Sequence, residues 1–142
     1  GADGALLAYG AMVYRCLQAA EKLSEKGIEV TVVNARFVKP LDKELILELI
    51  RNHKLIITAE DHALMGGFGS AVLELVSDER ENVNKILRMG IPDCFIEHGP
   101  RNLMLKNIGL DEGGIADKFI TTLDLMNIRG SFTKTGKQRL SV

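Results

Sequence analysis

Two pairs of an acidic residue and a histidine are the parts of this chain best suited to chemistry. Glu60 and Asp61 precede His62, and Glu97 precedes His98. A carboxylate beside a histidine can tune the ring for general acid or base catalysis near neutral pH. A histidine that only fixes a loop through hydrogen bonds would have the same neighbours. Both interpretations stay open from the residues alone, although the loop-fixing one is favoured for each pair.

A glycine cluster, Gly66-Gly67-Phe68-Gly69, comes after the first pair. Free amide groups at the start of a helix can bind phosphate. However, the chain has neither GxGxxG after its first strand nor GxxxxGK[ST], and Glu60 and Asp61 would repel an anion. The glycines are therefore expected to allow close packing between a helix and a strand.

The elements that position these residues alternate between strands and helices. Four short apolar runs predict strands, and the stretches between them carry apolar residues at helical spacing. Asp42 is predicted to cap the second helix, and Gly27 to lie just past the end of the first. The pattern indicates a three-layer α/β/α domain with an open, mainly parallel sheet in the strand order 2-1-3-4. The predicted strands are 5–9, 30–33, 55–59 and 86–89.

In such a sheet, both acid–histidine pairs come after the carboxyl ends of strands, where ligand and partner sites usually lie. The two histidines are therefore expected to share one crevice. Helical patterns continue around 103–108 and 115–125, and the periodic pattern fails from Gly130 onward. We predict one domain over residues 1–125 and a disordered tail over residues 126–142.

Composition excludes several classes of protein. The 142 residues carry 18 basic and 19 acidic side chains, so the net charge of -1 gives no reason to expect nucleic acid or a membrane surface as a partner. No apolar run approaches the length of a membrane span. The two cysteines, Cys16 and Cys94, form no CxxC or Cys/His cluster, which indicates reduced thiols in a cytoplasmic protein without a metal site.

Four motifs together resemble one family. They are residues 34–42 (Asn-Ala-Arg-Phe-Val-Lys-Pro-Leu-Asp), 60–62 (Glu-Asp-His), 66–72 (Gly-Gly-Phe-Gly-Ser-Ala-Val) and 90–99 (Gly-Ile-Pro-Asp-Cys-Phe-Ile-Glu-His-Gly). In this order they are similar to the C-terminal, transketolase-like domain of 1-deoxy-D-xylulose-5-phosphate synthase. Each motif alone is weak evidence, but four collinear motifs are specific.

The resemblance implies a thiamine-diphosphate enzyme that joins pyruvate and glyceraldehyde 3-phosphate with loss of CO2. Two upstream domains of the same polypeptide would hold thiamine diphosphate, magnesium and substrates, so we expect no catalytic, cofactor-binding or metal residue in this chain. The C-terminal domain would pack against those domains and a homodimer partner. The candidate residues for this corner are Arg36, Glu60, Asp61, His62, Gly66, Gly67, Gly69, Glu97 and His98.

The sequence differs from the family pattern in two respects, and two alternative interpretations of the chain stay open. Arg101 and Lys106 occupy a segment that the resemblance would make acidic, and an antiparallel edge strand that usually precedes the domain would have to lie before Gly1. The first alternative is the C-terminal subunit of a split transketolase-like enzyme. The second is a flavodoxin-like module that binds an anion or nucleotide at residues 66–69.

Overall fold

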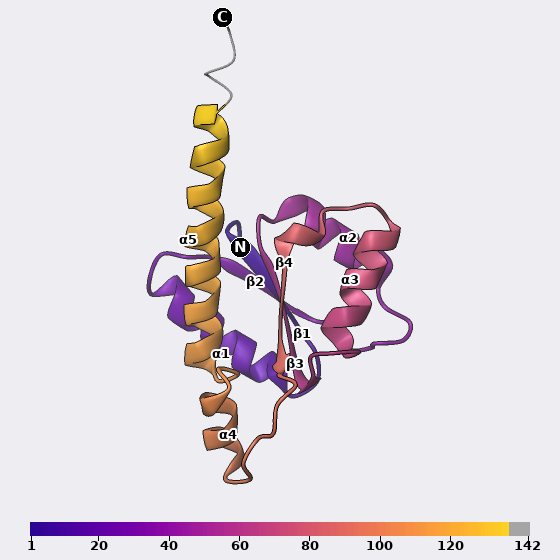
Figure 1. The fold of residues 1–142 in the computed structure, drawn as a ribbon, viewed down its shortest axis with the longest axis vertical. Helices are drawn as coiled ribbons and strands as arrows, with labels where there is room; N and C mark the ends of the chain where they lie inside the picture. The colour runs from indigo at the N-terminus through magenta and orange to yellow at the C-terminus, as the bar shows by residue number, and fades with distance from the viewer. Residues whose placement is uncertain (137–142) are drawn as a thin grey trace, which may run out of the picture.

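Four parallel strands form the middle layer of the protein. They are β1 (Gly4–Ala8), β2 (Val30–Asn34), β3 (Ile56–Ala63) and β4 (Ile86–Ile91). The strands pair in the order β2-β1-β3-β4, which confirms the predicted topology. The computed structural model describes residues 1–136, and Figure 1 shows the sheet between two layers of helices.

The helices cover both faces of this sheet. On one face lie α1 (Met12–Ser24), α4 (Arg101–Asn107) and α5 (Glu112–Gly136); on the other lie α2 (Lys43–Asn52) and α3 (Phe68–Asp78), with the short helix η1 (Val83–Lys85) leading into β4. Successive residues of β1 serve opposite faces, because side chains alternate along a strand. Leu6 packs with the α1 and α5 core, whereas Leu7 packs with the α2 and α3 core.

Two helix ends agree with the local sequence signals. The Asp42 side chain accepts a hydrogen bond from the backbone N–H of Leu45 at 3.1 Å, and so caps the start of α2. Gly27, just after α1, has φ +76°, a conformation that side chains with a Cβ rarely adopt.

Strands β3 and β4 are longer than predicted. β3 continues through Ala63, so Glu60, Asp61 and His62 belong to the strand and not to the loop after it. The reason is a bulge: Ala59 pairs with Met89 and Ala63 pairs with Ile91, so β3 uses two more residues than β4 over the same distance. In β3 an apolar pattern cannot reveal the extension, because Glu60, Asp61 and His62 are polar.

The end of the chain also differs from the expectation. The helical backbone of α5 continues to Gly136, whereas the sequence pattern predicted a disordered tail from residue 126. A helix satisfies its backbone hydrogen bonds internally, so it can continue without an apolar stripe. Residues 137–142 lie outside the described part of the chain, and the domain limit at residue 125 stays a prediction. Within residues 1–136, no helix has the length and apolar character that a membrane span requires.

Candidate functional site

The loops after β2, β3 and β4 emerge at one edge of the sheet, at the lower end in Figure 1. This carboxyl edge contains the predicted corner residues, but their exposure differs sharply. Glu60 is fully buried, and Asp61 is half-buried. Four of the predicted corner residues have exposed side chains: Arg36, His62, Glu97 and His98.

Glu60 is the cap of helix α3. One carboxylate oxygen, Oε2, accepts from the N–H of Phe68 at 2.7 Å, and the other, Oε1, accepts from the N–H of Gly69 at 2.8 Å. The N-cap position of α3 is Gly67, which has no side chain to satisfy these groups. The helix dipole and two charge-assisted hydrogen bonds stabilise the buried negative charge. Glu60 therefore closes the corner from inside the domain.

This arrangement bears directly on phosphate binding at residues 66–69. The amides of Phe68 and Gly69, which a phosphate would need, already donate to Glu60. The sequence suggested that Glu60 would repel an anion; in the structure its carboxylate occupies the anion's place. The flavodoxin-like alternative loses its binding site.

Glycine is required at the corner for two different physical reasons. A Cβ on Gly67 would collide with Glu60 Oε2 and with the Ala63 carbonyl oxygen, and a Cβ on Gly69 would lie 2.5 Å from Thr58 Oγ1. These contacts confirm the predicted close packing of helix and strand. Gly66 instead has φ +71° with open space around it, so it serves the turn.

Asp61 and His62 have different surroundings. Asp61 forms an ion pair with Arg101 of α4, so the basic residue noted as a departure from the family pattern has its partner within this domain. His62 lines a hollow of about 200 Å³ with Tyr9, Val38, Glu60, Gly66, Gly67 and Phe68. Tyr9 and Phe68 stack in it, with ring centroids 5.5 Å apart. His98 is not part of this hollow, so the hollow is not a crevice shared by the two histidines.

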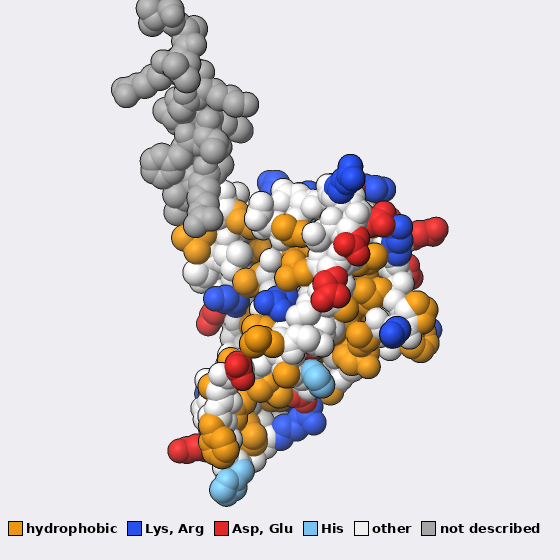
Figure 2. All heavy atoms as spheres, turned by 45° about the vertical axis from the view of Figure 1, so that its right-hand side comes forward, with side chains coloured by type: hydrophobic (Ala, Val, Ile, Leu, Met, Phe, Trp, Pro, Cys, Tyr) orange, Lys and Arg blue, Asp and Glu red, His pale blue; other side chains and the backbone are white. Residues whose placement is uncertain are grey.

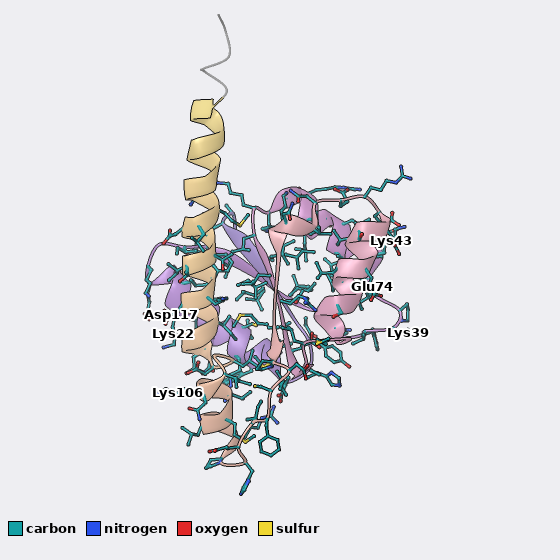
Figure 3. All side chains as sticks on the ribbon, in the orientation of Figure 1. Lys22, Lys39, Lys43, Glu74, Lys106 and Asp117 are labelled. Carbon is teal, nitrogen blue, oxygen red and sulfur yellow. The ribbon has the colours of Figure 1, made fainter. Side chains whose placement is uncertain are left out.

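Large apolar side chains are exposed on all three loops of the carboxyl edge. The exposed fraction is 65% for Phe37 after β2, 70% for Met65 after β3 and 94% for Phe95 after β4. Figure 2 shows hydrophobic side chains between charged and histidine side chains toward the lower end of the molecule, and in Figure 3 Lys39 and Lys106 lie on opposite sides of this region. Sequence reasoning did not identify Met65 or Phe95 as functional, although large apolar residues in loops after successive strands were a signal.

Much of the polar chemistry at this edge is already used within the domain. Among residues 1–127, whose side chains the structure describes, no group of three or more His, Cys, Asp or Glu side chains could hold a metal ion. The buried carboxylate of Glu60 and the amides at the start of α3 are occupied by each other. The described residues therefore do not fit thiamine diphosphate or its magnesium ion, whereas exposed aromatic and methionine side chains are typical of surfaces that a partner covers.

The fold and its carboxyl edge define a transketolase-type C-terminal domain. The family model for the transketolase C-terminal domain matches residues 1–115, and the chain belongs to this family. It is 53% identical over 116 residues to 1-deoxy-D-xylulose-5-phosphate synthase 1 of Geobacter sulfurreducens, which covers 82% of this chain and 18% of that protein. The Aquifex aeolicus 1-deoxy-D-xylulose-5-phosphate synthase is 47% identical over 116 residues, covering 81% of this chain and 18% of that protein.

Solved structures agree with this assignment. A split-gene transketolase described as an inactive beta4 tetramer superimposes with a TM-score of 0.80 at 32% identity, covering 89% of this chain and 41% of that chain. A transketolase variant from Pichia stipitis gives a TM-score of 0.64 at 18% identity over 87% of this chain and 17% of its own, which supports the fold alone. The chain thus spans about a fifth of the length of the synthases it matches.

Proposed function

We propose that this chain is the C-terminal domain of a 1-deoxy-D-xylulose-5-phosphate synthase. The whole protein would be a cytoplasmic, thiamine-diphosphate- and magnesium-dependent transferase that makes 1-deoxy-D-xylulose 5-phosphate and CO2 from pyruvate and glyceraldehyde 3-phosphate, for isoprenoid synthesis by the methylerythritol phosphate route. The 53% identity to the Geobacter sulfurreducens synthase and the four collinear motifs support this proposal. The chain alone would be inactive, because upstream domains would supply the cofactor site.

The role we assign to the domain is docking, and the carboxyl edge carries this assignment. Phe37, Met65 and Phe95 expose most of their surface there, on three separate loops. Exposed apolar groups of this size are stabilised when another protein surface removes them from water. The partner surfaces would be the upstream domains and the second subunit of a homodimer.

In this proposal His62 acts through packing and not through proton transfer. The two neighbours that could tune it are engaged elsewhere: Glu60 binds the amides of α3, and Asp61 pairs with Arg101. With neither carboxylate directed to the imidazole, His62 lacks the partner that orients a catalytic histidine.

Replacement of His62 by alanine in the full-length protein tests this role. We expect weaker dimerisation or a lower melting temperature and only a modest loss of turnover. Removal of a general acid or base would instead lower the rate by about 10²–10⁴-fold while the fold survives. A rate loss of that size with unchanged melting and dimer dissociation would place His62 in the active site.

A separate C-terminal subunit of a split enzyme is the second candidate. It is favoured by one observation: the structural neighbour at 32% identity is a split-gene transketolase. The gene sequence upstream of Gly1 distinguishes the two, since a continuous reading frame with a cofactor-binding domain supports the synthase. In either case, calorimetric titration of this chain with thiamine diphosphate and magnesium should show no binding, and saturable micromolar binding would contradict both proposals.

A further inference from the structure

A compact polar network holds the loop between β3 and α3. Arg88, a half-buried residue of β4, donates from Nη1 to the Leu64 carbonyl oxygen at 2.9 Å and to Ser70 Oγ at 2.7 Å. The Ser70 hydroxyl donates to the same Leu64 oxygen at 3.0 Å and accepts from the N–H of Gly66 at 3.2 Å. A hydroxyl has one proton to donate and two lone pairs to accept with, so Ser70 uses its full capacity here.

Arg88 reaches the loop across the first turn of α3. A Cβ on Gly69 would lie 3.0 Å from Cγ and 3.1 Å from Cδ of Arg88, and 2.5 Å from Thr58 Oγ1. Thr58 pairs with Arg88 in the sheet, so the arginine starts directly beside the strand that carries Glu60. The missing side chain at Gly69 therefore makes room for the aliphatic part of Arg88 as well as for Thr58.

The network acts on both sides of Met65. Its neighbour Leu64 is bound through the carbonyl oxygen, and its neighbour Gly66 is bound through the N–H in a turn with φ +71°. The Met65 side chain itself is 70% exposed. The direction in which Met65 leaves the domain thus depends on a residue that belongs to another strand.

We propose that Arg88 is a positioning residue for the carboxyl edge: by holding the 64–67 loop, it presents Met65 to the second subunit of the homodimer. This inference rests on the docking role proposed above. Arg88 does not touch the partner in this account; it acts through the loop. Its guanidinium suits the task because two bonds from a single nitrogen fix a carbonyl and a hydroxyl at once.

Hydrogen exchange in the 142-residue chain tests the loop step. In Arg88→Met we expect amides of residues 64–67, Gly66 foremost, to exchange about tenfold faster, while amides of β1 keep their protection. Lys118→Met is the matched control, because Lys118 lines the same cavity of about 230 Å³ as Arg88 but makes none of the bonds that hold the loop. Unchanged loop exchange, or acceleration spread evenly over the domain, would overturn the proposal.

Ser70→Ala sharpens this test and replaces it if Arg88→Met does not fold. Since both residues act through one network, Ser70→Ala should accelerate the same amides, and the double variant should add little to either single one. Arg88→Lys should restore part of the protection. Fully additive effects would show that Arg88 and Ser70 act separately, which contradicts a shared network.

The docking step is measured in the full-length protein. Arg88→Met should raise the dimer dissociation constant about tenfold, with Lys118→Met unchanged. Faster loop exchange with unchanged dissociation would overturn the role of Arg88 in docking. The synthase activity of the unmodified protein reports on the proposed function independently, so failure of one idea is distinguishable from failure of the other.

Discussion

The β3–α3 corner and the β4–α4 segment come after neighbouring strands, and each contains an acidic residue next to a histidine. In the first, Glu60 is fully buried and binds two amides, and the hollow around His62 has a stacked aromatic pair. In the second, Glu97 and His98 are exposed, and Phe95 exposes 94% of its surface. The same residue types thus close one corner and leave the other open.

The difference arises from the helix that comes next after each pair. Helix α3 starts with a glycine N-cap and lies against β3, so its unsatisfied amides meet the Glu60 carboxylate. Helix α4 starts after Pro100, has no side-chain cap, and buries only Leu105. Where a helix end lies against a strand, an acidic residue becomes part of the fold, whereas the short and mostly exposed helix α4 leaves the loop before it exposed.

The largest effect is expected from a substitution of Gly67, in the β3–α3 corner where Glu60 binds the amides of α3. In Gly67→Ala the new Cβ would meet the Glu60 carboxylate and the Ala63 carbonyl, so the free energy of unfolding should fall by about 2–4 kcal/mol. Urea denaturation of the chain measures this. Gly99→Ala in the open segment is the control, since no atom lies within 4 Å of its Cβ position. Equal midpoints for the two variants would show that the corner is not closed.

A smaller effect is expected when Glu60 loses its charge. The amide side chain in Glu60→Gln has a single acceptor oxygen for the two hydrogen bonds. The substitution should therefore leave Phe68 or Gly69 with an unsatisfied buried N–H and cost about 1.5–3 kcal/mol. Glu97→Gln is the control: Glu97 is an exposed acidic residue in the loop between β4 and α4, so this substitution should not change the unfolding midpoint. A Glu60→Gln variant as stable as the original protein would contradict the capping role.

The open segment is tested by Phe95→Ser. Because Phe95 touches almost nothing within the domain, the unfolding midpoint of the 142-residue chain should not change. In the full-length protein, the same substitution should raise the dimer dissociation constant about tenfold. Analytical ultracentrifugation at several concentrations gives this constant. A destabilised chain with normal dimerisation would mean that Phe95 belongs to the fold and not to the interface.

The smallest effect is expected in the labelling of the two cysteines, which report the difference between the buried core and the exposed loop after β4. Cys94 is exposed in the loop between β4 and α4, whereas Cys16 lies on the buried face of α1, and burial raises the pKa of its thiol to about 12. At pH 8 a maleimide should therefore label one thiol in the native chain and two in denaturant, since the thiolate is the reactive form. Labelling of both thiols under native conditions would show that the α1 core opens readily.

Much of the fold is encoded by local signals in the sequence. The alternation of apolar runs and helical stripes predicted the four strands and the five helices that flank them. Short crossovers, together with the rule that ligand sites lie in a crevice at the carboxyl ends of the strands, led to the order β2-β1-β3-β4. Asp42 and Gly27 mark their helix ends because a cap acts within three residues of itself. The family resemblance also came from the sequence, through motifs that are collinear along the chain.

The function of the corner residues depends on tertiary contacts. The partners of Glu60 lie eight and nine residues further along the chain, beyond a bulge whose length is set by pairing with β4. The partner of Asp61 comes from α4, and Arg88 reaches Leu64 and Ser70 from the neighbouring strand. No local pattern encodes these distances. The sequence does not show whether a carboxylate will be buried against a helix end or surrounded by water. Only tertiary packing determined that Glu60 is buried as the cap of α3 and that Phe95 is exposed.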